Sequence, residues 1–366
     1  MVDRKNIRKN ITIKVRGKII EINTQNLLNN IRIVKEKVKG GTKIFSVIKS
    51  NAYGHGIKNI VPLIDEFVDG WCVISLEEAL LTRKLSKKEI VILKGTSDKT
   101  ETKEAAEKKF TIVARDLIDL EQKMKSRVPN LLVKFDTGMG RLGILPDEID
   151  KFEDIVQKYK GKSRINGIIT HFAYSDFGDP NFIKKQNEIF DHISQRVEKF
   201  LGKRIIRTIS NSAGTLIGDD FHKDIVRPGI CIYGISPFGK EKDFSLKPAM
   251  SVKSRVLTIK EIPKGWSVGY SRKFIANERT KIAVIDIGYS DGIPRILWEQ
   301  GFVSINGKRF KIIGVISMDM LCSLCDNSVK PQDEVQIIGD DISIYEVAEK
   351  AQTIPYEILC SVGLKT

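Results

Sequence analysis

Between residues 43 and 234, short apolar runs alternate with longer segments of helical period, and each run ends at a turn-forming residue. This alternation is typical of repeated βα units, in which a buried parallel strand precedes an amphipathic helix. Eight such units in roughly 200 residues predict an α/β fold, a (β/α)8 TIM-like barrel. The predicted strands are Ile44–Ile48, Trp71–Ser75, Ile90–Leu93, Thr111–Val113, Leu131–Phe135, Gly167–Thr170, Ile205–Ile209 and Val226–Tyr233.

Beyond Lys247-Pro248 the pattern changes to runs of β character separated by Gly, Pro and Asn. We therefore expect a barrel domain over residues 24–245 and a C-terminal, mostly-β domain over residues 246–366. An early strand around Lys18–Ile22, within residues 1–23, is expected to join the second domain. Ile305-Asn306-Gly307 has the sequence of a tight hairpin turn. The predicted strands of this domain are Met250–Ile259, Lys281–Ile287, Phe302–Ile305 and Phe310–Val315.

The chain is strongly basic, with a formal net charge of +15 in 366 residues. Its lysines are scattered among glutamates on predicted helix faces, for example in Lys84–Lys88 and Lys99–Lys109, which indicates a solvated surface. An anionic substrate is the second interpretation of the charge. We expect no nucleic-acid partner, since basic charge alone carries no sequence-specific recognition.

No stretch approaches about 18 apolar residues without a charge, so no membrane span is expected. The opening Met1–Val15 lacks the continuous apolar segment of a signal peptide. Five cysteines, an odd number, favour a reducing cytoplasm over a disulfide framework. Cys322 and Cys325 form one CxxC pair without a second ligand pair at zinc-site spacing, so we predict structural thiols and no metal.

A barrel enzyme holds its reactive groups at the C-terminal ends of its strands, and polar residues gather there in this sequence. Lys49 follows the first strand, where partial desolvation lowers the pKa of an amine and favours imine chemistry. The alternative is an ordinary surface lysine. The other polar groups at strand ends are Lys134, Asp136–Arg141, His171, Ser210–Gly214 and, at the start of the eighth predicted strand, Arg227–Gly229.

Glycine-bearing turns follow the late strands at Ser212–Thr215 and Pro228–Ile230. Barrels commonly place backbone amides and hydroxyls around a phosphate at this point of the fold. A plain turn-forming glycine is the alternative at each turn. Each turn alone is a weak signal for a phosphate site.

The sequence resembles the bacterial alanine racemases in order from about Glu21 to Tyr356. The motifs that carry this resemblance are VIKSNAYGHG (47–56), KFDTGMGRLG (134–143), HFAYSD (171–176), NSAGT (211–215), VRPGICIYG (226–234), VGYS (268–271), GYSDGIPR (288–295), SMD (317–319) and TIPYE (353–357). As a set they are specific, although each alone is weak.

The resemblance implies a racemase that interconverts L- and D-alanine and supplies D-alanine for peptidoglycan. Lys49 would bind pyridoxal 5'-phosphate as a Schiff base and act on one face of the substrate, and Tyr270 would act on the other. Racemisation requires acid/base groups on both faces, because a proton removed from one face must return to the opposite one. The resemblance further implies that Tyr270 comes from the partner subunit of a homodimer.

Further roles follow from the same resemblance. Arg227 would face the pyridine nitrogen and keep it unprotonated, while His171 and Arg141 would form a hydrogen-bonded chain with the reactive tyrosine and the cofactor. Lys134 matches a lysine that is carbamylated in many members. The substrate side would include Arg141, Met318, Tyr289 and Lys134. The cofactor side would include Lys49, Tyr53, His171, Asn211, Ser212, Arg227, Gly229, Ile230 and Tyr356.

The chain departs from the family pattern at several positions: Ser317 replaces a common Cys, Ser271 a common Gly, and Val315 an Arg that lines the way into the site. The family's basic ending, Arg-Val-Pro-Arg, which belongs to a final strand, is missing after Ser361. Alternative functions are a racemase for serine or a basic amino acid, a decarboxylase of the same plan, or a non-catalytic pyridoxal-phosphate homeostasis protein. Alanine is favoured because Tyr289 and Tyr356 are bulky and would leave room for little more than a methyl group.

Overall fold

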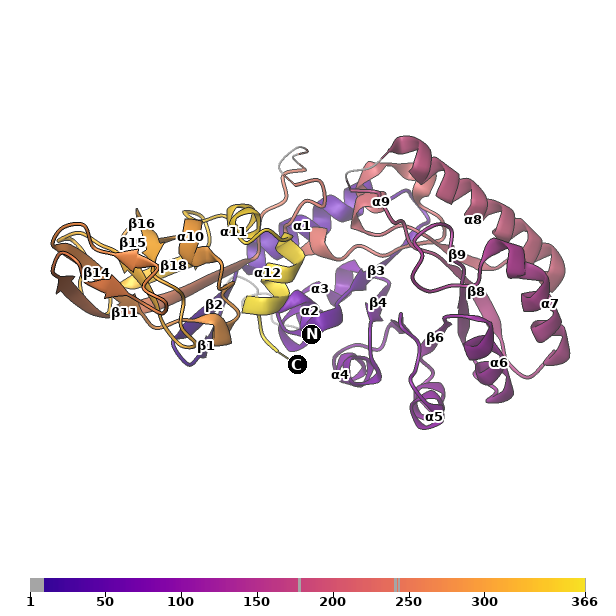
Figure 1. The fold of residues 1–366 in the computed structure, drawn as a ribbon. Coiled ribbons are helices and arrows are strands. Elements are labelled where there is room, and N and C mark those ends of the chain that lie inside the picture. The colour runs from indigo at the N-terminus through magenta and orange to yellow at the C-terminus, as the bar shows by residue number, and fades with distance from the viewer. Residues whose placement is uncertain (1–9, 177–178, 240–241, 243, 366) are drawn as a thin grey trace.

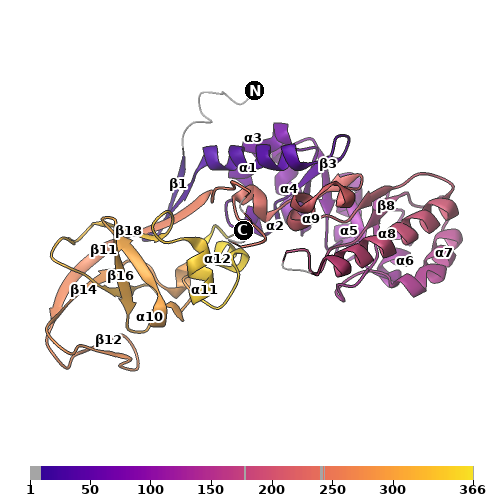
Figure 2. The same cartoon turned by 90° about the horizontal axis from the view of Figure 1, so that it is seen from above.

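The computed structural model describes residues 10–176, 179–239, 242 and 244–365. The described chain forms two bodies side by side, a barrel surrounded by helices and a smaller, mostly β body (Figures 1 and 2). Most of the N-terminal charges, from Asp3 to Lys9, lie outside the described residues. Among the described residues, no helix is long and apolar enough to cross a membrane.

The barrel is a sheet of eight parallel strands in the order β10-β3-β4-β5-β6-β7-β8-β9. The backbone N–H groups of Asp224 and Arg227 donate to the carbonyls of Arg207 (3.0 Å) and Ser210 (2.9 Å) and close the sheet between β9 and β10. The predicted α/β barrel is confirmed. Its strands are β3 (Lys43–Val47), β4 (Gly70–Val73), β5 (Glu89–Ile92), β6 (Thr111–Ala114), β7 (Leu131–Lys134), β8 (Ile165–Ile169), β9 (Ile206–Thr208) and β10 (Ile225–Val226).

Helices cover the outside of the barrel, and local sequence signals start several of them. The side chains of Asn23, Ser75, Asp98 and Asp116 each accept a hydrogen bond from a backbone N–H in the first turn of the helix that follows. The helices of this body are α1 (Thr24–Lys37), α2 (Lys49–Tyr53), α3 (Ile57–Ile64), α4 (Leu76–Leu85), α5 (Lys99–Glu107), α6 (Leu117–Lys125), α7 (Ile149–Lys158), α8 (Pro180–Leu201) and α9 (Ser212–Ile217), with 3-10 turns η2 (Asp65–Phe67), η3 (Pro146–Glu148) and η4 (Asp219–Phe221).

The eighth predicted strand, Val226–Tyr233, is wrong over most of its length. Strand β10 ends at Val226, before Arg227, and Ile230–Tyr233 is a 3-10 turn, η5. Pro228 has no N–H to donate to a ladder, and Gly229 turns the chain with φ −128° and ψ −87°. The apolar run that resembles a strand is instead a buried turn.

The second sheet is antiparallel, with the order β1-β2-β11-β14-β17-β16-β15-β18 and a further pairing of β18 with β11 that closes six of the strands into a ring. Asn306 (φ 54°) and Gly307 (φ 76°) turn the chain between β15 and β16 as the hairpin signal predicts. The strands of this sheet are β1 (Ile11–Val15), β2 (Lys18–Ile22), β11 (Met250–Ile262), β14 (Thr280–Ile285), β15 (Phe302–Ile305), β16 (Lys308–Ile313), β17 (Leu321–Leu324) and β18 (Glu334–Ile338). Strands β12 (Ser267–Val268) and β13 (Phe274–Ile275) pair with each other in a separate antiparallel hairpin.

The second body is tied to the barrel at several points. Strand β2, which leads into α1 of the barrel, pairs with β11. Helix α12 (Pro355–Val362) contacts α2 at the mouth of the barrel, and both lie together in Figure 1. The remaining short elements of this body are η6 (Tyr289–Asp291), α10 (Leu297–Gln300) and α11 (Ile344–Lys350). The division of the chain near residue 245 stays a prediction.

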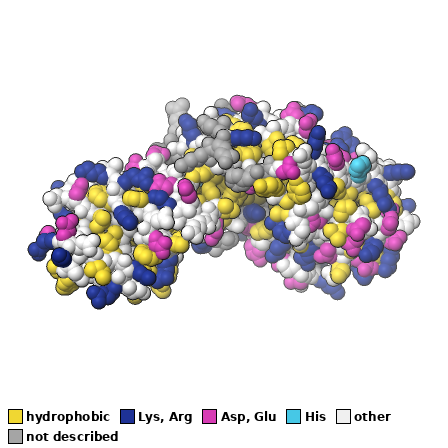
Figure 3. Space-filling model, turned by 45° about the horizontal axis from the view of Figure 1, so that its top comes forward, with side chains coloured by type: hydrophobic (Ala, Val, Ile, Leu, Met, Phe, Trp, Pro, Cys, Tyr) yellow, Lys and Arg dark blue, Asp and Glu magenta, His cyan; other side chains and the backbone are white. Residues whose placement is uncertain are grey.

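The chain ends without a final strand in its described part. Helix α12 continues to Val362, and Gly363 to Lys365 follow outside any strand, against the loop after Lys49. On the face shown in Figure 3, Lys and Arg side chains are mixed with Asp and Glu over both bodies, which supports the interpretation of the net charge as solvated surface.

Candidate functional site

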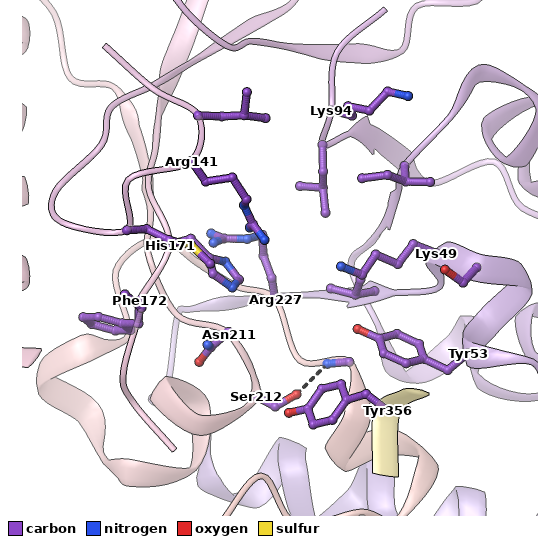
Figure 4. A pocket seen from close by; sticks show the side chains of 18 of the residues that line it. Lys49, Tyr53, Lys94, Arg141, His171, Phe172, Asn211, Ser212, Arg227 and Tyr356 are labelled. Atoms are coloured by element: carbon purple, nitrogen blue, oxygen red, sulfur yellow. Dashed lines mark hydrogen bonds between the residues drawn. The ribbon is translucent and has the colours of Figure 1, made fainter. Parts of the chain in front are cut away.

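A cavity of about 760 Å³ opens at the C-terminal ends of the barrel strands (Figure 4). It is lined by residues at or after the ends of β3, β7, β8 and β10, by the start of α9 and by α12. Most of the predicted site residues line it, namely Lys49, Tyr53, Lys134, Arg141, His171, Asn211, Ser212, Arg227, Gly229 and Tyr356. Ile230 is buried directly beyond Gly229.

Lys49 is the residue best placed for covalent chemistry. It follows β3 and Ile48, its side chain is half-buried, and its amine has no hydrogen bond or ion pair within the described part of the chain. Burial lowers the pKa of Lys49, and the positive charge of Arg141 lowers it further. The neutral amine, which attacks carbonyl carbon, is therefore more accessible than in an ordinary surface lysine.

The chain leaves Lys49 through a left-handed turn. Ser50, Asn51, Ala52 and Tyr53 have φ between 49° and 57°, a conformation that costs L-residues roughly 1–2 kcal/mol each. Two of the turn's backbone hydrogen bonds, Ala52 N–H to the Ile48 carbonyl (2.8 Å) and Gly54 N–H to the Ser50 carbonyl (3.0 Å), are local. The turn brings Tyr53, four residues after Lys49, into the same cavity.

Part of this turn is held by a buried carboxylate that the sequence analysis did not single out. Glu78 on α4 is 3% exposed and accepts hydrogen bonds from the backbone N–H groups of Asn51 (3.1 Å) and Ile74 (2.9 Å). The sequence signal at Ser75–Glu78 is that of a helix start. That the same carboxylate reaches the turn after Lys49 depends on tertiary packing, so spacing alone does not reveal it.

Positive charge is concentrated in the cavity, where Lys49, Arg141 and Arg227 lie around His171 (Figure 4). Lys134 lines the same cavity and adds its charge to theirs. Burial lowers the pKa of His171 well below its ordinary value, and the positive charge of Arg227 is the next contribution. The imidazole is therefore neutral at neutral pH. A cavity with this charge suits a ligand that carries phosphate or carboxylate groups.

Arg227 is the most deeply buried of these cations, at 4% exposure. Its guanidinium donates to the carbonyls of Thr170 (2.7 Å) and Ile209 (3.1 Å) and to the Thr208 hydroxyl. Burial lowers the pKa of Arg227 to about 10, so the guanidinium stays charged at neutral pH. These contacts fix a permanent donor at the floor of the cavity.

Arg141 is carried by a loop that Asp136 organises. The Asp136 carboxylate accepts from the backbone N–H groups of Gly138 (2.9 Å), Met139 (2.7 Å) and Arg141 (3.0 Å). Burial would raise the pKa of Asp136, but these amide hydrogen bonds hold it below its ordinary value. The sequence contained a signal for this role, because Asp followed by Gly two residues later is typical of a side chain that bonds its own loop.

One corner of the cavity is lined with hydroxyl groups. Gly229 N–H donates to the Ser212 hydroxyl at 2.8 Å, the dashed line in Figure 4. A Cβ at Gly229 would lie 2.7 Å from the Tyr53 hydroxyl, so a larger residue would close this corner. Burial raises the pKa of both Tyr53 and Tyr356, which therefore remain protonated donors. Hydroxyl and amide donors of this kind fit a phosphate monoester, and Lys49 stands in the same cavity to bind an aldehyde.

Asn211 has a structural role at this corner. Its side-chain oxygen accepts from the Gly214 N–H (3.0 Å) at the start of α9 and from the Ser175 hydroxyl (3.0 Å). Lys94 and Cys360 also line the cavity, although neither was predicted. Lys94 follows β5, so the rule that directed attention to strand ends could have found it, whereas Cys360 comes from α12.

Three predicted residues of the second body do not reach this cavity, unlike Tyr356 on α12, which lines it. Tyr270, Tyr289 and Met318 are 63%, 41% and 54% exposed. They belong to adjoining segments, because Tyr270 pairs with Val315 and the Tyr289 N–H donates to the Ser317 carbonyl (3.1 Å). Exposed apolar and aromatic side chains in one place indicate an interaction surface.

Comparison with known sequences gives matches over both bodies. Residues 22–237 match the family described as alanine racemase, N-terminal domain, and residues 249–366 match alanine racemase, C-terminal domain. The chain is 33% identical to alanine racemase 2 of Caldanaerobacter subterraneus over 96% of this chain and 94% of that protein. It is 34% identical to the alanine racemase of Aeromonas hydrophila, covering 94% and 97%.

Solved structures are similar in both fold and sequence. The alanine racemase of Bartonella henselae with covalently bound pyridoxal phosphate matches with a TM-score of 0.84 and 31% identity, covering 96% of this chain and 98% of that one. The alanine racemase from E. faecalis matches with a TM-score of 0.87 and 28% identity, covering 95% of this chain and 96% of that one.

Proposed function

The chain belongs to the alanine racemase family, and from this premise we propose that it interconverts L- and D-alanine with pyridoxal 5'-phosphate bound to Lys49. The observation that carries the assignment of Lys49 is its half-buried amine after β3, which has no hydrogen bond or ion pair to any described residue and lies in a cavity rich in positive charge. The family is one of pyridoxal-phosphate-dependent isomerases, and the hydroxyl-lined corner supports the phosphate site.

The cofactor, when bound, supplies an electron sink that makes the α-hydrogen of an amino acid acidic. We propose that Lys49 Nζ takes or returns this proton on one face of the substrate and that Tyr270 Oη does so on the other. The lowered pKa of Lys49 brings its amine closer to the neutral form that a base requires. The exposure of Tyr270 supports its delivery to the cavity of a partner subunit in a homodimer.

The barrel cations would set the electronic environment. Arg227 keeps its proton at neutral pH and can only donate, so it would leave a facing pyridine nitrogen unprotonated and weaken the electron sink. We propose that Arg141, with the Met318 backbone of the partner subunit, holds the substrate carboxylate. His171, neutral at this pH, would pass hydrogen bonds between Arg141 and the reactive tyrosine.

The experiment that tests this proposal is an absorbance spectrum of the purified protein together with an assay of D-alanine formed from L-alanine. The account predicts the yellow absorbance of lysine-bound pyridoxal phosphate and D-alanine production. Absorbance without turnover of alanine would shift the proposal to another amino acid or to a non-catalytic carrier. A protein without the absorbance when supplied with the cofactor would contradict it.

Lys134 gives the site a pH-dependent stability. Burial and the nearby charges of Arg141 and Arg227 lower the pKa of Lys134 from 10.5 to about 8. Between these pH values the unfolded chain holds the proton more firmly than the folded chain, so raising the pH favours folding. We expect this one group to add roughly 3 kcal/mol to the free energy of unfolding between pH 8 and 10.5.

Urea unfolding of the cofactor-free protein across this pH range, in buffers freed of carbon dioxide, measures the effect. Lys134→Met replaces the alkyl part of the side chain and removes the amine, so the wild type should gain roughly 3 kcal/mol of stability relative to this variant as the pH rises from 8 to 10.5. A pH-independent difference would contradict the lowered pKa. Carbon dioxide is removed because a neutral amine forms a carbamate with it, which would change the charge of the Lys134 side chain during the measurement.

Tyr356 is proposed to restrict the substrate side chain. It lines the cavity beside Tyr53, with ring centroids 6.3 Å apart. Tyr356→Asn removes the ring and should raise kcat/KM for serine by about tenfold or more. The side chain of serine is larger than that of alanine by only one hydroxyl group, and the space left by the ring would accommodate it. Tyr356→Phe, which keeps the ring, is the matched control. Unchanged serine turnover in a cofactor-saturated Tyr356→Asn protein would overturn this assignment.

We also propose that the enzyme works in the cytoplasm and supplies D-alanine for peptidoglycan. The five cysteines are all free thiols in the structure, which supports a reducing compartment. The proposed reaction forms D-alanine, which fits a role in supplying this amino acid for peptidoglycan.

A further inference from the structure

The last described residues, Gly363 to Lys365, bind the left-handed turn that follows Lys49. The Asn51 side-chain amide donates to the backbone carbonyls of Lys365 (3.1 Å) and Leu364 (3.4 Å). The Leu364 N–H donates to the Gly54 carbonyl at 2.8 Å. We call residues 363–365 the C-terminal latch. These contacts join positions more than 300 residues apart in the sequence.

Close backbone packing reinforces these hydrogen bonds. A Cβ on Gly54 would lie 2.7 Å from the Gly363 Cα and 2.5 Å from the Leu359 carbonyl oxygen. A Cβ on Gly363 would lie 2.4 Å from the Gly54 Cα. Two glycines therefore let the latch and the turn touch at the backbone, a contact that any other residue at either position would force apart.

The base of the latch is itself fixed. The buried amine of Lys18 on β2 donates to the carbonyls of Val362 (2.8 Å), the residue before the latch, and Asp291 (2.9 Å). Strand β2, η6 and the end of α12 are thereby held together. The latch thus extends from a rigid part of the second body into the barrel mouth.

The turn needs support from outside its own sequence. Its consecutive residues from Ser50 to Tyr53 adopt a backbone that L-residues rarely hold, and local hydrogen bonds satisfy only part of it. Glu78 supports the Asn51 N–H from one side, and the latch supports the Asn51 side chain and Gly54 from the other. If the latch is removed, we expect the turn to relax and to displace both Lys49 and Tyr53.

We propose that the C-terminal latch is a positioning element for the proposed cofactor lysine, through which the end of the chain sets the affinity of the barrel for pyridoxal phosphate and the rate of turnover. This rests on the role proposed above for Lys49. Arg141 is held by the Asp136 loop, which the latch does not touch. Loss of the latch should therefore lower kcat and cofactor affinity while leaving KM for alanine nearly unchanged.

Ending the chain at Gly363 removes three hydrogen bonds to the turn. We expect the dissociation constant for pyridoxal phosphate to rise about tenfold to a hundredfold, with a fall in kcat of similar size. Lys365→Ala is the matched control in the full chain. Its backbone carbonyl still accepts from Asn51, and only an amine that caps α12 through the Cys360 and Ser361 carbonyls is lost. This variant should behave as the wild type.

Asn51→Gly provides the second variant and keeps the test decisive if the shortened chain fails to fold. Glycine adopts the left-handed backbone of Asn51 without strain, so the change removes only hydrogen bonds of the side chain. These are its bonds to the latch and the one that its Oδ1 accepts from the Ile57 N–H (2.8 Å), which is why weaker binding in this variant is attributed to the latch only in combination with the shortened chain. If the latch acts through Asn51, the two changes combined should weaken cofactor binding by less than the product of their separate effects. The proposal would be contradicted if the combined change weakened cofactor binding by the full product of the two separate effects. It would also be contradicted if the Asn51→Gly protein bound the cofactor with wild-type affinity.

Hydrogen exchange of the cofactor-free protein gives a readout independent of activity. The amides of Ala52 and Gly54 should exchange about tenfold or more faster without the latch, while amides of β7 keep their protection. If all amides of the protein exchanged faster to the same degree, the latch would have only a structural role and the proposal would fail. The same conclusion would follow if kcat fell and KM for alanine rose by equal factors. If the wild-type protein lacks the cofactor absorbance, the proposed function itself is overturned. If the wild-type protein has the absorbance and the shortened chain binds the cofactor and turns over alanine equally well, only the role of the latch is overturned.

Discussion

Replacing Lys49 by alanine should abolish the yellow absorbance of bound pyridoxal phosphate and lower racemisation by about four orders of magnitude or more. The reason is that one amine performs two proposed tasks, binding the cofactor covalently and moving a proton at the α-carbon. The cavity offers Lys94 and Lys134 as other amines, but neither follows β3 beside Tyr53. Absorbance spectra and D-alanine formation of the purified variant measure both tasks.

Lys58→Ala is the matched control, because it makes the same chemical change on an exposed position of α3. It should keep both the absorbance and the activity. A Lys49→Ala protein that folds, retains the absorbance and still forms D-alanine would show that another amine binds the cofactor, with Lys134 as the next candidate.

Replacing Tyr270 by phenylalanine should lower racemisation about a thousandfold while leaving the cofactor absorbance in place. Only one hydroxyl is lost, and Lys49 and the phosphate corner are untouched. In deuterated water the α-hydrogen of one enantiomer should still exchange through Lys49, while exchange of the other enantiomer should slow with racemisation. This asymmetry is the signature of two bases on opposite faces.

Tyr159→Phe is the control for the loss of a hydroxyl, since Tyr159 bonds Glu121 at 2.9 Å on α6 and does not line the cavity. Its racemisation should match that of the wild type. If Tyr270→Phe also retained full racemisation, or if both enantiomers lost exchange equally, Tyr270 would not be the second base.

The barrel was predictable from sequence because its strands are buried on both sides and their apolar runs are bounded by turn residues. The same reasoning failed at Ile230–Tyr233, where a buried 3-10 turn has the composition of a strand. The apolar composition of this segment reflects its burial, but Pro228 and Gly229, at the edge of the cavity, determine its backbone conformation.

The conformation of the turn after Lys49 was beyond sequence reasoning. Ser, Asn, Ala and Tyr in a row have no collective preference for a left-handed backbone, and the groups that hold them come from Glu78 and from the latch at the other end of the chain. The motif around Lys49 located the site, but only the packed structure shows how the lysine is held.

The barrel residues of the candidate site could be predicted to meet, whereas the residues from the second body could not. Barrel residues such as Arg227 and His171 meet because strands of one sheet end at one edge, and the order of strands predicts this. Tyr270 and Met318 lie exposed on the second body, and our proposal places them in the site of a partner subunit. The assignment of these two residues therefore stays a proposal.

The central claim is that Lys49 and Tyr270 form one active site across two subunits, and mixing the two inactive variants tests it most directly. Lys49→Ala and Tyr270→Phe subunits, unfolded together and refolded at equal concentration, should form mixed dimers in which one of the two sites is intact. We expect recovery of about a quarter of wild-type activity, because half of the dimers are mixed and each mixed dimer has one working site of two. Activity that stays at the level of the separate variants would place both residues in the same subunit's site and contradict the claim.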